Sequence, residues 1–430
     1  MGGVTLHPSY PMVIEGGVFA LLVAVLVIGL VRRRANDHLA GWLTLAGLAG
    51  LSLAAWNAEP GRVAFEGSFA LDELAIFGKR LFLISASLSV LASLGMTHAS
   101  FRTRGTEYYV AFLASLLGML VLASARDLVV LFVAFELMSI PLYFLTGFLK
   151  GDEAAPEGAM KFFLVGSISS AVILYGISFV YGAAGTTAMS AIPALTNSGH
   201  PLMLLGLALV LAGLGFKIAA VPFHMWVPDT YEAASTPFVA WLSIAPKTAG
   251  FMAILRLYVE GVGPGALLWV PLISTLAGVT IVAGNLMAIP QKNIKRLLAY
   301  SGVAHIGYLL LGLAAMSVSG VTMVLFYLVA YMFGNMGAFF VVQAVAGAER
   351  SDNLDVYRGL ARRSPALALS LLLFLLSLGG IPFVAGFWAK LFVFWAVVEQ
   401  GMYFLAFLGA VLTVVALYYY LVVARRMYIE

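Results

Sequence analysis

The sequence contains no cysteine. The chain therefore has no thiolate to hold an iron–sulfur cluster and no disulfide, and its six scattered histidines predict no metal site. Charged residues are also scarce, at 10% against 62% hydrophobic residues, which excludes most soluble folds. We see no nucleophile–base pair, phosphate-binding loop or nucleotide fingerprint, and we expect no nucleic-acid partner. The composition predicts a protein that crosses the lipid bilayer many times.

Hydrophobic runs near the ~20 residues that a bilayer requires recur about 13 times. Two of them, 201–235 and 365–397, are too long for one straight helix and carry Pro and Gly in the middle, so we interpret each as one broken span. The predicted fold is all-α, with about 13–14 transmembrane helices. The spans cover residues 12–31, 39–57, 71–97, 107–125, 127–149, 158–182, 201–235, 237–259, 265–289, 295–316, 318–347, 365–397 and 401–424.

The positions of lysine and arginine predict the orientation. If the N-terminus lies outside, most of the 24 Lys and Arg residues fall in inner loops, and only Arg62, Arg126 and Arg256 fall in outer loops or ends. This bias follows the positive-inside rule for a multi-pass protein of the plasma membrane or cell inner membrane. Counting 201–235 as two full spans would reverse the predicted side of every later loop and place the basic loops outside. The charge bias therefore also favours one broken span.

Several cationic residues remain inside predicted spans, namely Lys79, Arg80, Lys217, Lys247 and Lys390. A charge at the bilayer centre costs about 2.5–3.5 kcal/mol on insertion scales, so such residues are usually functional. The alternative is a lysine that extends to the surface from near a helix end, but Lys247 is too central in its span to do so easily. Lys79 and Arg80 are equally consistent with a structural role, paired with Asp72, Glu73 or a neighbouring subunit.

Prolines lie close to two of the intramembrane charges. Pro222 soon follows Lys217, and Pro141 soon follows Glu136, the one acid well inside a span. Each proline removes a helix hydrogen bond, and the freed backbone groups are tolerated at membrane depth only beside protein or water. The sequence therefore predicts a polar, hydrated site within the membrane, and His224, next to the first break, is expected to line it.

A weak internal repeat relates the two halves of the chain. GLGFKIAAVPF and GGIPFVAGFWAK each join a Gly/Pro break to a buried lysine, although the lysine precedes its proline in the first motif and follows it in the second. Glu136 and His305 are separated by nearly the same number of residues as Lys217 and Lys390. Paired interrupted helices are typical of transporters built from inverted repeats. We expect a three-helix N-terminal segment and two inverted five-helix repeats, each with a broken helix, at 1–106, 107–260 and 261–430.

The titratable residues within the membrane are suited to proton transfer. Burial disfavours the charged form of a lysine, whereas a nearby carboxylate favours it. A Glu–Lys pair that opens and closes can therefore switch a lysine between holding and releasing a proton, with no cofactor in this chain. A lone histidine, however, is also often a satisfied core residue. The predicted carriers are Glu136, Lys217, Lys247 and Lys390, with His224 and His305 in support.

Four separated motifs carry a family resemblance. FELMSIPLY, PFHMWVPDTYEAASTPFVAWLSIAPKTAGF, NIKRLLAYSGVAHIGY and SLGGIPFVAGFWAKLFVF together resemble the antiporter-like membrane subunits of respiratory complex I, over about 107–425. The S-I-A-P-K pattern around Lys247 and a lysine in the second broken helix are similar to the subunit N group of that family. The resemblance implies that Glu136 and Lys217 form a pair, that Lys247 is the connecting residue and that Lys390 lies at the output toward the outer side.

The resemblance also implies how the work is divided among subunits. NADH, FMN, the iron–sulfur clusters and quinone would belong to partner subunits, and this chain would be a non-redox, proton-translocating subunit of NADH–quinone oxidoreductase. Its partners would be other membrane subunits, including a neighbouring antiporter-like subunit and small membrane subunits. The main alternative is a subunit of an Mrp-type sodium–proton antiporter, which needs no redox partner. A third hypothesis is a membrane scaffold, in which the buried charges only fix helix packing.

Overall fold

The computed structural model describes residues 11–31, 38–197, 199–257 and 269–429. Over these ranges the chain is helical apart from one short β-hairpin and the connecting loops, and 12 helices are long and apolar enough to cross a membrane. The all-α, multi-pass fold expected from the sequence is confirmed. The predicted span 365–397 is not among the 12, because a break divides it into two shorter helices, α16 (Pro365–Gly379) and α17 (Ala385–Glu399).

The chain divides into two compact units, each built from two stretches of sequence. The first unit is Met1–Lys217 with Ala245–Gly265, and the second is Ile218–Ile244 with Ala266–Glu430. The chain therefore leaves the first unit directly after Lys217 and returns to it at Ala245. Both crossing points adjoin breaks in membrane-spanning segments.

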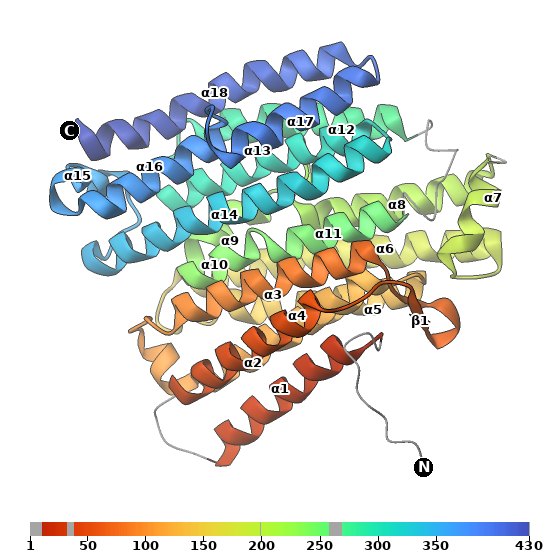
Figure 1. Ribbon diagram of the computed structural model, residues 1–430, viewed down its shortest axis with the longest axis horizontal. Coiled ribbons are helices and arrows are strands. Elements are labelled where there is room, and N and C mark those ends of the chain that lie inside the picture. Colours follow the sequence, from red (N-terminus) through yellow and green to blue (C-terminus); the bar gives the residue numbers. More distant parts are fainter. Residues whose placement is uncertain (1–10, 32–37, 198, 258–268, 430) are drawn as a thin grey trace. The chain divides into compact units, whose positions relative to one another are not determined.

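Apart from the short α7, the helices of the first unit run side by side in Figure 1. A hairpin of β1 (Arg62–Ala64) and β2 (Phe69–Leu71) joins two of them, with antiparallel pairing of Arg62 to Leu71. The helices are α1 (Val13–Val31), α2 (His38–Trp56), α3 (Glu73–Ser93), α4 (Ala99–Ser124), α5 (Leu128–Thr146), α6 (Ala154–Ala184), α7 (Ile192–Asn197), α8 (Pro201–Ile218) and α11 (Ala245–Arg256).

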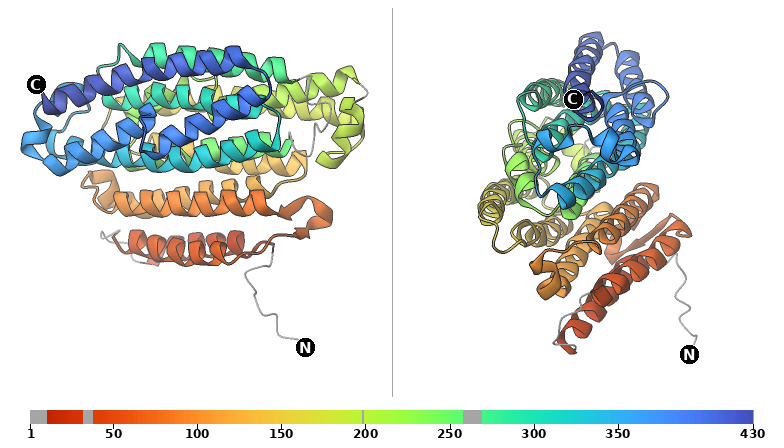
Figure 2. Two further views of the ribbon diagram at one scale, coloured as in Figure 1. Left: turned by 45° about the horizontal axis from the view of Figure 1, so that its top comes forward. Right: turned by 90° about the vertical axis from the view of Figure 1, so that its left-hand side faces the viewer.

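The central helix of the second unit is α13 (Ile294–Ala314), in which almost every residue is buried. Figure 2 shows the last helices of the chain lying alongside it. The other helices are α9 (Trp226–Ala233), α10 (Thr236–Leu242), α12 (Val270–Ala288), α14 (Val318–Glu349), α15 (Leu360–Arg363), α16, α17 and α18 (Tyr403–Tyr428).

In each unit a glycine lets two helices approach closely at a corresponding position. A Cβ on Gly118 of α4 would lie 2.3 Å from the backbone nitrogen of Met138 on α5. A Cβ on Gly284 of α12 would lie 2.4 Å from the backbone nitrogen of Ala304 on α13. Both positions therefore exclude any side chain, and small residues of this kind let membrane helices approach closely. Met138 follows Gly118 by the same number of residues as Ala304 follows Gly284.

Both helix breaks predicted from Gly and Pro are present. In the first, α8 ends at Ile218 and Ala219 takes a left-handed conformation with φ of 65°. In the second, α16 ends before Gly380 at φ 80°, and Phe383 has φ of 79°. A left-handed φ is rare for residues with a side chain, and such positions persist only where the surroundings impose them.

A third interruption lies in the run 237–259, which the sequence analysis treats as continuous. The helix stops after Leu242, turns through Ser243 and Ile244, and restarts as α11. Pro246 explains the restart, because proline has no N–H to donate and is suited to the first turn of a helix. The interruption sets Lys247 in the first turn of the new helix.

Candidate functional site

Lys217 lies in the last turn of α8 and is 1% exposed. Its Nζ donates a hydrogen bond to Ser139 Oγ of α5 at 3.0 Å. The ring centres of Phe135 and Phe162 lie 5.4 Å and 5.7 Å from the same nitrogen, within the range of cation–π attraction. One hydroxyl and two aromatic faces thus surround the ammonium group in a site otherwise closed to water.

Small residues bring α8 close enough for these contacts. A Cβ on Gly206 of α8 would lie 2.7 Å from the carbonyl oxygen of Gly176 on α6. Nearer to Lys217, the Ser169 hydroxyl of α6 donates to the carbonyl of Gly213 at 2.7 Å. The end of α8 is therefore held against α6 where the helix stops.

Glu136 is held by a different hydroxyl. Ser170 of α6 donates to Glu136 Oε1, and Glu136 acts electrostatically on Lys217. Yet among the ion pairs of the described residues, none joins Glu136 to Lys217; the contact with α5 is made by Ser139, one helical turn beyond the acid. Each of the two charged groups is thus bonded to a different serine among the described contacts, and sequence reasoning missed both serines.

Lys247 is 1% exposed, in a helix in which every residue is buried. At the other end of this helix, Arg256 makes two hydrogen bonds to the carboxylate of Asp72, at 2.8 Å and 2.9 Å. Arg256 also donates to the carbonyl of Ala123. Because Asp72 caps the N-terminus of α3 as well, accepting from Ala75 N at 2.8 Å, this clamp joins α11 to α3 and α4.

Lys390 is the buried lysine of the second unit, 3% exposed on α17. Its Nζ reaches the carbonyl of Gly379 at 3.4 Å, at the end of α16, and lies 4.6 Å from the ring centre of Tyr308. The last carbonyls of a helix lack partners within it and carry partial negative charge. The break therefore supplies the acceptor for the lysine that follows it.

His305 lies within a set of tyrosines. Its Nδ1 is 2.7 Å from the hydroxyl of Tyr327, its Nε2 is 3.4 Å from that of Tyr420, and Tyr331 stacks on its ring at 4.8 Å. A small cavity of about 10 Å³ borders the imidazole and two of these tyrosines. Tyr308, whose ring centre is 6.0 Å from that of His305, links this set to Lys390.

His224 follows the first break and is 7% exposed. Its Nδ1 is one of several buried polar atoms that have no hydrogen-bond partner within the described residues, together with Thr230 Oγ1 and Ser235 Oγ. Buried polar atoms are normally bonded to protein or ordered water, so these positions are suited to ordered water. The break itself is tied to α12, because Val221 N donates to Thr280 Oγ1 at 3.1 Å.

Lys79 and Arg80 find other partners than the sequence suggests. Lys79 Nζ lies 2.8 Å from Glu15 Oε1 of α1, and Arg80 donates to the carbonyls of Ala55 and Trp56. The expected pairing with Asp72 or Glu73 is wrong for Lys79, because the Asp72 carboxylate is already engaged by Arg256 and by the end of α3. Asp72 and Glu73 are the acids nearest to Lys79 in sequence, but the fold of α1 brings Glu15 closer in space.

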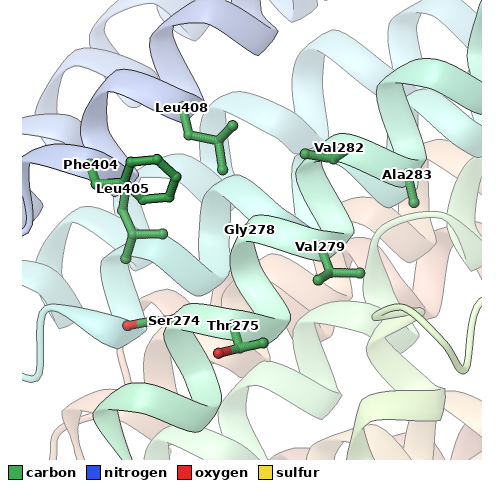
Figure 3. Close-up of a pocket in the computed structure, with 9 residues that line it drawn as sticks. All are labelled: Ser274, Thr275, Gly278, Val279, Val282, Ala283, Phe404, Leu405 and Leu408. Atoms are coloured by element: carbon green, nitrogen blue, oxygen red, sulfur yellow. The ribbon is translucent and has the colours of Figure 1, made fainter.

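A groove of about 660 Å³ between α12 and α18 carries none of this chemistry (Figure 3). Leu405 and Leu408 of α18 face Gly278 and Val279 of α12 across it. No lining residue is ionisable, so the groove is apolar surface of the kind that membrane proteins present to lipid.

Comparison with known proteins gives consistent results. Residues 125–416 match the family described as NADH:quinone oxidoreductase/Mrp antiporter, TM. Subunit N of the NADH-quinone oxidoreductase of Moorella thermoacetica is 43% identical over 412 residues, which cover 95% of this chain and 86% of that protein. A chain in the structure of respiratory complex I from Thermus thermophilus with bound aureothin is 34% identical, with a TM-score of 0.83, over 97% of this chain and 90% of that one.

A chain in the structure of the Mrp complex from Dietzia sp. DQ12-45-1b has the same fold, with a TM-score of 0.89 over 99% of this chain and 81% of that one. Its identity is only 24%, so the likeness extends to the fold alone. The family match spans more than half of the described chain, and relatives of far higher identity cover nearly all of it. The chain therefore belongs to the family of NADH:quinone oxidoreductase and Mrp antiporter membrane subunits.

Proposed function

We propose that the chain is a proton-translocating membrane subunit of NADH–quinone oxidoreductase. One observation carries the proposal: Lys217, Lys247 and Lys390 are each at most 3% exposed, and each adjoins an interruption of a membrane-spanning helix. Intramembrane lysines of this kind mark ion pathways, and broken helices supply the unpaired backbone groups that such pathways use. The solved structures support this complex over the Mrp antiporter, at 34% identity against 24%.

The first part of the proposed path is a switch at the end of α8. With Glu136 nearby, Lys217 holds a proton; when the carboxylate moves toward Ser170, the lysine keeps only the hydroxyl of Ser139 and two aromatic faces. Burial disfavours an ammonium group that has lost its counter-charge. The proton is then released toward Lys247, the connecting residue.

The second part of the proposed path ends at Lys390. The Gly379 carbonyl and the ring of Tyr308 hold the ammonium group without any acid, so the lysine gains little that would prevent release. His305 and its tyrosine hydroxyls supply hydrogen bonds that lead to the same tyrosine. His224, whose Nδ1 has no hydrogen-bond partner in the part of the chain that the structure describes, lies beside the first break and lines a hydrated entrance.

The proposal includes the repeat architecture. The Gly118–Met138 and Gly284–Ala304 contacts recur at matching positions. Each half also has a helix break near its lysine, after Lys217 in the first half and before Lys390 in the second. These features support two inverted five-helix repeats, at 107–260 and 261–430, after a three-helix segment at 1–106. Ser139 directly follows Met138, as His305 directly follows Ala304. The matching contacts therefore suggest that Ser139, rather than Glu136, occupies the position equivalent to His305.

The remaining assignments concern the surroundings of the chain. We place it in the plasma or cell inner membrane with the N-terminus outside, next to another antiporter-like subunit and small membrane subunits. It acts as a subunit of the translocase but carries no redox centre itself, because NADH, FMN, the iron–sulfur clusters and quinone belong to partner subunits. The absence of cysteine is consistent with this division.

Isolation of the native assembly tests the proposal. We expect the chain to purify with subunits that show iron–sulfur signals and NADH-driven quinone reduction, coupled to proton uptake or release across the membrane. In the same assembly, Lys217→Ala is expected to abolish translocation. A cluster-free assembly that exchanges sodium for protons would assign the chain to the antiporter instead. Full translocation by Lys217→Ala would refute the proposed path.

A further inference from the structure

A buried ion pair lies apart from the residues of the proposed path. Lys79 Nζ of α3 and Glu15 Oε1 of α1 are 2.8 Å apart, and the two side chains are 0% and 2% exposed. The ring centre of Phe69 lies 5.0 Å from the same nitrogen. Taking two charges out of water is so costly that a pair of this kind is weak evidence for a purely stabilising role.

The pair is also incompletely satisfied. Glu15 Oε2 is buried and has no hydrogen-bond donor within the described part of the chain. A pair that only fastens two helices gains most when further hydrogen bonds fill its remaining positions. The short N–O distance, in contrast, permits a proton to pass from one group to the other. The N–H bond of the ammonium breaks as an O–H bond forms on the carboxylate, giving a neutral amine and a neutral acid with no change in net charge.

The pair lies beside the helix that carries Lys247. A Cβ on Gly78 would lie 3.4 Å from Met252 Cγ, so α3 contacts α11 at the residue before Lys79. Met252 comes five residues after Lys247, a rise of about 7.5 Å along the helix. Arg256, at the far end of α11, acts electrostatically on Lys79. Lys79 therefore lies one residue from a contact between α3 and the helix that holds Lys247.

We propose that Glu15 and Lys79 form a further proton-exchange site, in which a proton passes between Lys79 Nζ and Glu15 Oε1 and the loss of the positive charge on Lys79 acts on α11. The site rests on the proposed function, because it adds a station to the same translocation. It also gives the N-terminal helices a part in proton transfer. The neutral form of the pair is the one that a dry membrane interior favours.

The test uses the intact complex in its own membrane. We compare the double variant Glu15→Gln with Lys79→Met against a matched control, Glu157→Gln with Lys161→Met, which removes the exposed ion pair on α6 with its 2.7 Å contact. Losing both charges leaves no uncompensated charge, so the amount of complex in the membrane should stay normal. We expect a several-fold loss of proton translocation in the first double variant and none in the control. Normal translocation in both would overturn the site.

A second measurement applies if the double variant fails to assemble. Glu15→Asp keeps a carboxyl group and should retain the assembly and part of the translocation. The pH-difference infrared spectrum of the purified complex should contain a protonated-carboxyl signal that shifts in this variant. A spectrum with no signal that depends on Glu15 would overturn the site.

Measurement of Lys217→Ala in parallel separates the two proposals. Loss of translocation in Lys217→Ala, with normal translocation in the Glu15 and Lys79 double variant, refutes the exchange site and leaves the proposed function standing. Normal translocation in Lys217→Ala refutes the proposed function itself.

Discussion

Lys217 contacts α5 through the hydroxyl of Ser139, 3.0 Å from its Nζ, and not through the carboxylate of Glu136. The carboxylate is held instead by Ser170 of α6. Each charged group therefore has a neutral hydrogen-bond partner on a neighbouring helix. Under the proposed Glu–Lys switch this arrangement corresponds to the open form, and both hydroxyls become part of the mechanism to be tested.

The first prediction concerns Glu136. Glu136→Gln should abolish proton translocation although it keeps shape and hydrogen bonding, because Lys217 then loses its counter-charge. Glu136→Asp should retain part of the activity. Lys217→Ala should resemble Glu136→Gln, and the double change should be no worse than either alone, since residues that act as one unit are not additive. Proton uptake and the amount of complex in the membrane are measured together.

The scaffold alternative predicts a different pattern for the same variants. If the two charges only fix packing, Glu136→Gln leaves the buried Lys217 uncompensated, at a cost of about 3–5 kcal/mol, and should impair assembly. Lys217→Ala, which leaves the half-buried Glu136 without its counter-charge, should impair assembly as well. The neutral double change should then restore assembly and activity. A fully active Glu136→Gln complex would end the pair hypothesis.

The second prediction concerns Ser139. Ser139→Ala removes the hydrogen-bond acceptor of Lys217, and an unsatisfied buried group costs about 1–3 kcal/mol. We expect slower translocation with normal assembly, and partial recovery in Ser139→Thr, which restores a hydroxyl. Ser178→Ala is a matched control, because this exposed serine of α6 bonds only within its own helix turn among the described contacts. Equal rates for Ser139→Ala and the control would show that the hydroxyl is dispensable.

The third prediction concerns Lys390. As the terminal proton carrier, it must release its proton, so Lys390→Ala should reduce coupled turnover while the complex still assembles. Lys390→Arg should also fail, because arginine remains protonated. Turnover and translocation of both variants are compared in native membranes. Normal pumping by Lys390→Arg would show that the residue acts through its charge alone.

The fourth prediction concerns orientation. We expect Arg104, Lys295 and Arg363 to face the cytoplasm and the 183–200 segment to face outward. Because the chain has no cysteine, single cysteines at these positions can be labelled one at a time with a reagent that does not cross the membrane. Labelling of positions 295 and 183–200 from the same side would contradict the orientation.

The fifth prediction concerns the clamp at Asp72, which lies outside the membrane-spanning helices. Burial raises the pKa of Asp72, but the hydrogen bonds and charge of Arg256 lower it by more, so its net pKa is below the usual value. A lowered folded-state pKa contributes stability above the unfolded-state pKa, about 4, and this contribution is lost as the pH falls through the folded value. Asp72→Asn should therefore destabilise the protein at neutral pH by about 1–3 kcal/mol.

Thermal inactivation of the detergent-solubilised complex at several pH values measures this effect. The difference between Asp72→Asn and the unchanged protein should shrink as the pH falls below about 4. Glu73→Gln, an exposed change in the first turn of the same helix, is the control. A difference that stays constant with pH would show that the carboxylate charge has no part in the clamp.

Much of the fold follows from hydropathy, because in a bilayer every long apolar run must become a helix. The breaks near Pro222 and Gly380 were predictable for the same reason, since these residues interrupt a helix locally. The turn at Ser243 was not, because neither residue of the turn is Gly or Pro and the proline lies three residues on. The sequence therefore predicts a helix break only where a Gly or Pro lies within the break itself.

The candidate site was predictable in its charges but not in its contacts. Glu136 and the buried lysines are conspicuous because ionisable groups are rare in apolar runs. Ser139, Ser170 and Tyr308 carry no such signal, since serine and tyrosine are common in membrane helices. Glu15 was missed because its partner lies on another helix, and long-range pairing has no trace in the local sequence.

The division of the chain has a consequence for its synthesis. The first unit is completed only by α11, and α11 is made after α9 and α10, which belong to the second unit. Domains that are continuous in sequence can fold one after another as they leave the ribosome, N-terminal first. Here the first unit must wait until residue 256 has emerged before Arg256 can meet Asp72. Nascent chains cut short before that point should therefore remain sensitive to proteases, although most helices of the first unit are already present.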